Sequence, residues 1–76
     1  MSTIYILMEK VDLGGDPLVA YSNEAEAVSN CEIRNINDKQ AQRDRLLKIG
    51  YTQQMADEAV FYREQFYIQE VHLKHD

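Results

Sequence analysis

The stretch TIYILMEKV, residues 3–11, determines the fold that the sequence predicts. It is dense in residues that favour β-strands. Successive side chains of a strand point to opposite faces, and here both faces are apolar. One face carries Ile4, Ile6 and Met8, and the other carries Tyr5 and Leu7. A strand of this kind is typical of the middle of a sheet, so we expect a partner strand on each side of it.

Turn and strand signals outside this stretch supply the two partners. Residues 12–16, DLGGD, predict a hairpin turn, because their glycines can adopt positive φ. Residues 18–21 alternate as a short second strand, with Pro17 at its first position, where a missing N–H is tolerated. The closing stretch FYIQEVHL, residues 66–73, predicts a third strand.

The segment between the second and third strands reads as helical. Asn23, followed by Glu26 three residues later, is a typical N-cap arrangement. Gly50 stands where a left-handed residue ends a helix, and Thr52 caps the helix that follows.

The middle of this segment leaves two alternatives open. Asn35 and Asn37 are weak helix formers, so the first helix is expected to end or bend within residues 35–38. Asp38 would then cap a second helix. One long kinked helix is the alternative.

These elements predict a single α+β domain over residues 1–76. A sheet face and a helix stripe each need an apolar partner. We therefore expect a three-stranded antiparallel sheet in the order 2-1-3, with two or three helices packed on one face.

The charge distribution favours a protein partner. The net charge is −5; residues 1–33 carry six acids and one base, whereas residues 34–48 carry five bases and two acids. An acidic chain repels phosphate backbones, so direct nucleic-acid binding is not expected and a basic protein surface is. For residues 34–48, surface ion pairing is the expected role. The sequence shows neither an apolar run of about 18 residues nor a secretory signal, so we expect a cytoplasmic location and no membrane contact.

No residue pattern predicts an enzyme, a metal site or a cofactor. His72 and His75 lie in a strand and a tail, where they cannot converge on one metal ion. Gly14-Gly15 lacks the further glycine, the lysine and the following helix of a phosphate-binding loop. The single cysteine, Cys31, is expected to be a small half-buried helix residue rather than a reactive thiol.

The two-faced first strand bears most directly on function. If the helices cover one sheet face, Tyr5 and Leu7 lie on the uncovered face with one alternating set from each neighbour. That set is expected to be Val19, Tyr21, Tyr67 and Val71. Tyrosines are enriched in interfaces, because they present a rigid apolar body with a polar tip. The alternative is that the helices bury both faces, or that isolated exposed tyrosines have no role.

Two resemblances bear on function. Residues 43–62, RDRLLKIGYTQQMADEAVFY, resemble the helix, Gly-aromatic loop and helix of ubiquitin-associated domains, in which the loop carries the ubiquitin contact. The chain departs from that family by lacking a third helix and by placing the segment between strands. The same pattern is also a generic capped helix-turn-helix, which is the interpretation adopted.

The whole chain resembles the small acidic orphan proteins of bacteriophages and mobile elements. The shared features are a YIL-type first strand, a helix opening with SNEAEA at residues 22–27, and a terminal FYIQEV strand at residues 66–71. Such proteins commonly block host enzymes or defence complexes, including CRISPR effectors, by stoichiometric binding. The resemblance implies an anti-CRISPR-like inhibitor that acts by occlusion.

The sequence thus predicts a non-enzymatic protein-binding module that docks an acidic, tyrosine-bearing surface onto a larger host protein that handles nucleic acid. The predicted binding residues are Tyr5, Leu7, Glu9, Asp12, Asp16, Tyr21, Glu24, Glu26 and Tyr67. The alternative is a structural or regulatory domain that forms a homodimer through the open sheet face. A third hypothesis, single-strand nucleic-acid binding by sheet aromatics, needs basic flanks that the strands lack.

Overall fold

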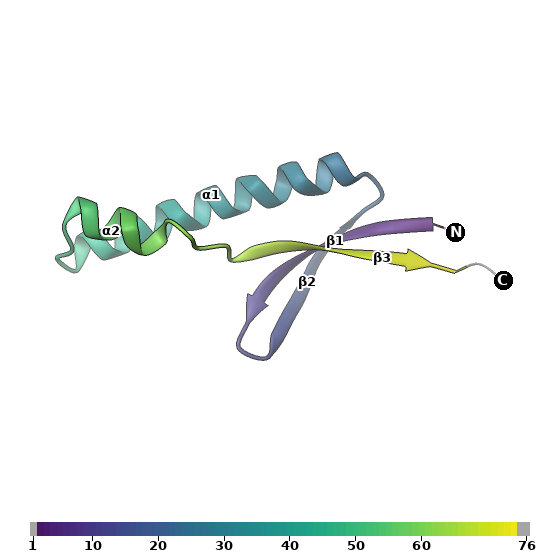
Figure 1. Ribbon diagram of the computed structural model, residues 1–76, viewed down its shortest axis with the longest axis horizontal. Helices are drawn as coiled ribbons and strands as arrows, with labels where there is room; N and C mark the ends of the chain where they lie inside the picture. Colours follow the sequence, from purple (N-terminus) through teal and green to yellow (C-terminus); the bar gives the residue numbers. More distant parts are fainter. Residues whose placement is uncertain (1, 75–76) are drawn as a thin grey trace.

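The computed structural model describes residues 2–74 and shows a three-stranded antiparallel sheet with two helices (Figure 1). The elements in chain order are β1 (Ser2–Val11), β2 (Gly14–Tyr21), α1 (Glu24–Lys48), α2 (Gln53–Val60) and β3 (Phe66–Leu73). The strand order is β2-β1-β3, with β1 in the middle. The predicted α+β class and strand order are confirmed, and the number of helices is two.

The β1–β2 hairpin differs from its prediction in where β2 begins. The strand starts at Gly14, whose φ of 118° requires glycine, rather than at residue 18. Pro17 lies inside the strand, at a register shift: Leu7 pairs with Val19 and Met8 pairs with Pro17. A proline is tolerated there because β2 is an edge strand and the shift interrupts the hydrogen-bond ladder.

α1 is one continuous helix of 25 residues, so the predicted end of the helix at residues 35–38 is wrong and the alternative of one long helix is the one that forms. Its N-cap is as predicted, with the Asn23 side chain accepting a hydrogen bond from the Glu26 N–H at 3.1 Å. Asn35 and Asp38 do not break the helix, because their side chains bond to the segment that enters β3. Weak local propensity is overridden here by tertiary contacts.

The end of α1 confirms the prediction made from Gly50. The Gly50 N–H donates to the Leu47 carbonyl at 3.2 Å, and the Tyr51 N–H donates to the Leu46 carbonyl at 3.0 Å. Gly50 has a φ of 106°. This pair of bonds is the Schellman motif, which satisfies the last carbonyls of a helix. Thr52 then caps α2 by accepting a hydrogen bond from the Met55 N–H.

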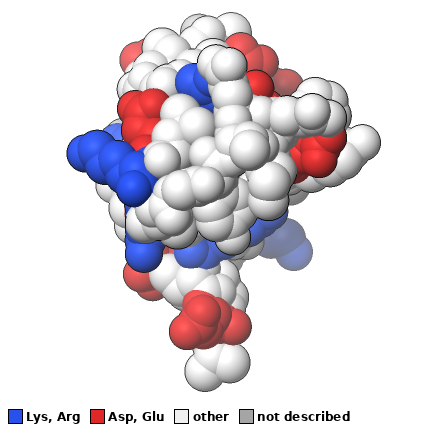
Figure 2. Space-filling view, turned by 90° about the vertical axis from the view of Figure 1, so that its left-hand side faces the viewer, with Lys and Arg blue, Asp and Glu red and all other residues white. Residues whose placement is uncertain are grey.

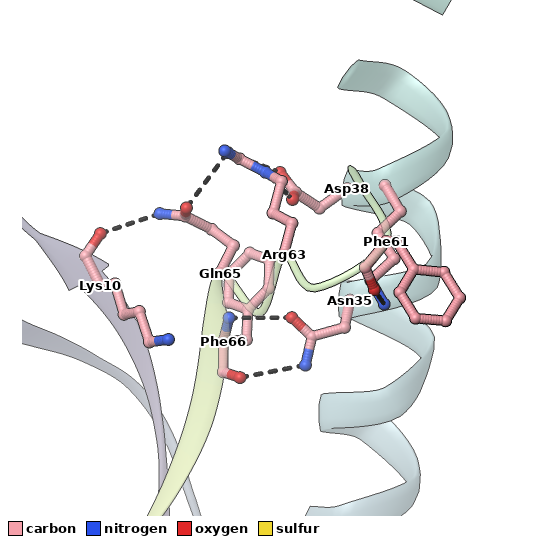
Figure 3. Close-up of polar contacts among 8 residues, drawn as sticks. Lys10, Asn35, Asp38, Phe61, Arg63, Gln65 and Phe66 are labelled. Atoms are coloured by element: carbon pink, nitrogen blue, oxygen red, sulfur yellow. Dashed lines mark hydrogen bonds and ion pairs between the residues drawn. The ribbon is translucent and has the colours of Figure 1, made fainter. Parts of the chain in front are cut away.

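The side-chain amide of Asn35 anchors β3 to α1 (Figure 3). Its Nδ2 donates to the Phe66 carbonyl at 3.0 Å, and its Oδ1 accepts from the Phe66 N–H at 2.9 Å. The amide therefore binds one residue of β3 in the way that a neighbouring strand would.

A second set of polar contacts fixes the segment between α2 and β3 (Figure 3). Arg63 Nε donates to the Asp38 carboxylate at 2.6 Å, and Arg63 also donates to the Gln65 side chain at 3.1 Å. Gln65 in turn pairs with the backbone of Lys10 through two hydrogen bonds of 2.8 and 2.9 Å. The network ties α1 and β1 to the start of β3.

The molecule is long and thin, with a small core. α1 crosses one face of the sheet, and its C-terminal half extends beyond the sheet together with α2, which packs on it (Figure 1). The described residues span 58 × 26 × 15 Å. The buried apolar side chains among them are Leu7, Met8, Ala27, Cys31, Ala56 and Val60.

Candidate interaction surfaces

The strand register decides which side chains share each face of the sheet. Residues paired across antiparallel strands point to the same side, so Leu7 shares its face with Val19 and Ile68. Phe66, which pairs with Glu9, is on this face too, and Arg34 of α1 lies 5.7 Å over its ring. The Leu7 face is therefore the one that α1 covers, and Leu7 itself has no exposed surface.

The predicted tyrosine patch does not form. Tyr67 pairs with Met8 and Val71 pairs with Ile4, so both point away from Tyr5 and Leu7. Val19 and Tyr21 do share a face with Tyr5 and Leu7, as predicted, but α1 covers that face. For Tyr67 and Val71 the prediction is wrong, because the register of β3 places them on the opposite face. Leu7 cannot contact a partner in this fold, since it is fully buried.

Tyr5 and Tyr21 pair with each other on the covered face and are half-buried. Loss of solvation raises the pKa of the Tyr5 phenol. The charge of Glu24 and its hydrogen bond to Tyr5 raise this pKa further, and the charge of Glu70 adds to the effect. Tyr5 therefore contacts the start of α1, rather than a free surface.

The predicted acidic residues form two groups instead of one surface. Glu9 pairs with Asp16, and Asp12 lies in the adjoining turn. Glu24 and Glu26 lie in the first turn of α1. The two groups lie toward opposite ends of β2, where Asp16 and Tyr21 are about 16 Å apart along the strand at 3.3 Å per residue.

The face opposite α1, which we name the open face, is apolar. Its members follow from the pairing of Met8 with Tyr67 and of Ile4 with Val71. The apolar residues that it carries are Ile4, Ile6, Met8, Pro17, Ala20, Tyr67, Val71 and Leu73. Its polar side chains are those of Ser2, Lys10 and Gln69. Residues 3–11 indicated an apolar strand on both sides, but the sequence did not say which side α1 covers.

A second candidate surface, which was not predicted from the sequence, lies at the C-terminal end of α2. Phe61 and Tyr62 are 65% and 89% exposed, and their rings meet edge to face at 4.8 Å between centroids. With Asp57 and Glu58 they line a shallow hollow of about 240 Å³. We name these four residues the aromatic–acidic surface. The FY pair directly after the last buried residue of α2 was the available signal.

The basic stretch of residues 34–48 is largely used within the molecule. Arg43 forms an ion pair with Asp57, and Lys39 Nζ donates to the Phe61 carbonyl at 3.1 Å.

Figure 2 looks onto the end of the molecule that carries the α1–α2 turn, and shows an uncharged area in the centre with acidic and basic side chains at its margins. Ile49, Tyr51 and Met55 belong to this end and are 41–66% exposed.

Within residues 2–74, no group of three or more His, Cys, Asp or Glu side chains could hold a metal ion. His72 contacts Thr3, whose Oγ1 lies 3.1 Å from the ring Nδ1, and His75 lies outside the described residues.

No helix among the described residues is long and apolar enough to cross a membrane. Comparison with known protein families, curated proteins and solved structures finds no match to this chain.

Burial of Cys31 leads to a prediction about pH. Desolvation, followed by the charges of Glu64 and Glu32, raises the pKa of its thiol above the ordinary value of a cysteine. The folded state therefore retains a proton that the unfolded state releases. The contribution of the thiol to the free energy of unfolding is complete at low pH and is lost as the pH rises above about 8.5. We expect the urea midpoint to decrease as the pH is raised from about 7.5 to about 10. The raised pKa of Tyr5 should add to this decrease near the top of the range.

Cys31→Ala provides the control for this measurement. The variant should lose the part of the decline that begins near pH 8.5, and in the wild type the thiol should react with a thiol reagent far more slowly than in urea. A urea midpoint that stays constant over this pH range would contradict the assignment.

Proposed function

We propose that this chain is a non-enzymatic protein-binding module that docks onto a larger protein through the aromatic–acidic surface. The observation that supports this most is the exposure of two adjacent aromatic rings, Phe61 at 65% and Tyr62 at 89%. Exposed aromatic clusters of this kind mark interaction sites, because burying such rings supplies much of the energy of an interface. The hollow beside them offers a place for a partner's side chain.

The position of the pair lowers the entropic cost of binding. The two rings stack edge to face, and Lys39 holds the backbone carbonyl of Phe61 against α1. A partner would therefore meet aromatic groups whose backbone is already placed. In Tyr62, most of the side chain remains free to be buried.

Charge favours a partner with a basic surface. The chain carries a net charge of −5, and Glu58 stands at the edge of the hollow. Long-range attraction of this kind mainly increases the association rate and weakens as salt is added. The partner class that fits is a larger basic protein, as nucleic-acid-handling proteins commonly are.

The resemblance to phage orphan proteins supplies the specific form of the proposal. In that form the partner is a host nucleic-acid-handling or defence complex, and binding blocks its working surface. The test is whether expression of the chain restores plaque formation on cells that carry the defence system, and whether a variant of the aromatic–acidic surface fails to do so.

Affinity capture provides the direct test of binding. Tagged wild-type protein, the double variant Phe61→Ala/Tyr62→Ala and the control Leu13→Ala are compared in bacterial lysate at low and high salt. Leu13 is the matched control, because it is an apolar side chain that is 99% exposed at the far hairpin turn. We expect the wild type and the control to retain a stoichiometric partner, and the double variant to bind it at least about 30-fold more weakly.

Two results would contradict the proposal. One is capture of the same partner by the double variant at wild-type yield, and the other is an equal loss of binding in the Leu13→Ala control.

The open face favours a second candidate function, self-association, which is compatible with the first because it uses a different surface.

A further inference from the structure

We propose that the open face of the sheet is the interface of a two-fold symmetric homodimer, in which a second copy of the chain packs its own open face against it. The aromatic–acidic surface lies outside this interface, so the inference does not depend on the proposed function. The argument rests on the composition of the face, the surface area of the chain and the state of the sheet edges.

The composition of the open face is that of an interior surface. Ile4 and Ile6 of the central strand are half-buried and Met8 is 8% exposed, and Tyr67 and Val71 of β3 flank them. In a sheet with one solvated face, that face normally carries polar side chains in alternation. Here the alternation is apolar on both sides, and only one side is covered by α1. A contiguous apolar face of this kind, with Lys10 at one end, is typical of a site of association.

The surface area of the chain points in the same direction. The described structure exposes 5815 Å². A compact monomer of this mass is expected to expose about 4,800 Å². The radius of gyration is 15.7 Å, compared with about 11 Å for a compact domain of this length. This excess of about 1,000 Å² includes surface of the helices that extend beyond the sheet (Figure 1), and it is of the order of the roughly 800 Å² that each partner buries in a standard interface.

The sheet edges favour contact between faces rather than between strands. β2 is an edge strand that carries Pro17 and a register shift in its pairing with β1. In β3, the side chain of Asn35 already occupies the N–H and the carbonyl of Phe66. Glu70 lies at the middle of β3, where a second β3 strand would bring two like charges together. Such features protect an edge from pairing with another chain.

The chemistry of the open face favours a second copy over a basic partner. Among residues 2–74, the face carries no acidic side chain, because Glu9, Asp16 and Glu70 all belong to the opposite face. A basic surface would therefore find nothing to pair with there. An identical apolar face is complementary to it in an isologous contact. The two α1 helices would lie on the outside, and the ends of the molecule at which α2 packs on α1 would remain accessible (Figure 1).

Light scattering and sedimentation equilibrium test the proposal across roughly a hundred-fold concentration range, because a dimer's population depends on concentration. The wild type is expected to show twice the chain mass of 8.9 kDa. Ile6→Lys should raise the dimer dissociation constant at least about 100-fold, because each interface would bury two unpaired ammonium groups. The control Ile36→Lys, the same change at a helix position that is 65% exposed, should leave the dimer intact.

A second variant guards against loss of folding. Gln69, the cross-strand neighbour of Ile6, is exposed, so Gln69→Lys removes no apolar contact and should also weaken the dimer while the circular dichroism spectrum stays unchanged. A wild type that is monomeric throughout the range would overturn the proposal. So would a dimer that survives Gln69→Lys with unchanged affinity, or one that dissociates on Ile36→Lys. Phe61→Ala/Tyr62→Ala should remain dimeric, which separates this test from that of the proposed function.

Discussion

Replacement of Leu7 by alanine is expected to lower the free energy of unfolding by about 3 kcal/mol, within the range for leucine-to-alanine changes in protein cores. Leu7 has no exposed surface, and it is the largest fully buried side chain among residues 2–74. It lies in the central strand under α1, so the cavity would open between the sheet and the helix that covers it. Domains of this length are stabilised by only about 4–11 kcal/mol in total.

The size of the effect reflects how little else is buried. At about 4–8 °C per kcal/mol for a small domain, the melting temperature should fall by about 12–24 °C. The matched control is Leu13→Ala, the same substitution at a side chain that is 99% exposed, for which we expect a change within about 0.5 kcal/mol. Equal stability of the two variants in urea unfolding would show that α1 does not pack on the Leu7 face.

Asn35→Ala is expected to lower the free energy of unfolding by about 2 kcal/mol, because it removes two hydrogen bonds from partly buried groups. The amide of Asn35 donates to the Phe66 carbonyl and accepts from the Phe66 N–H, at 3.0 and 2.9 Å. Alanine has the higher helix propensity, so local helix formation alone would predict the opposite sign. Chemical unfolding monitored by circular dichroism measures the difference.

Asn37→Ala isolates the local contribution. Asn37 is exposed on the same helix two residues away, so its replacement should be neutral or slightly stabilising. Asn35→Asp should fall between the two, because an aspartate accepts from the Phe66 N–H but cannot donate to its carbonyl. If Asn35→Ala and Asn37→Ala proved equally stable, the anchoring role of Asn35 would be wrong.

Elements with a local cause could be predicted from the sequence. Gly50 ends α1 because positive φ is accessible to glycine, and Asn23 and Thr52 cap helices through bonds to backbone groups three residues away. The apolar run of residues 3–11 predicted that β1 is the central strand. A strand with apolar side chains on both faces is typical of the middle of a sheet. The class and the strand order therefore followed from the chain itself.

Features that depend on distant partners could not be predicted. α1 passes unbroken through Asn35 and Asp38 because their side chains bind Phe66 and Arg63, which lie 31 and 25 residues further on. Local propensity contains no information about such bonds. The start of β2 was misplaced for a related reason, since Pro17 is tolerated only because the strand lies at an edge.

The candidate binding surface shows the same division. The sequence by itself determined that β1 is apolar on both faces and that the chain is acidic. Only the tertiary structure decided that α1 covers the side with Tyr5 and Leu7, which leaves Tyr67 and Val71 on the open side. The physical reason is that a strand alternates with a period of two, so a difference of one residue in register moves every side chain to the other face.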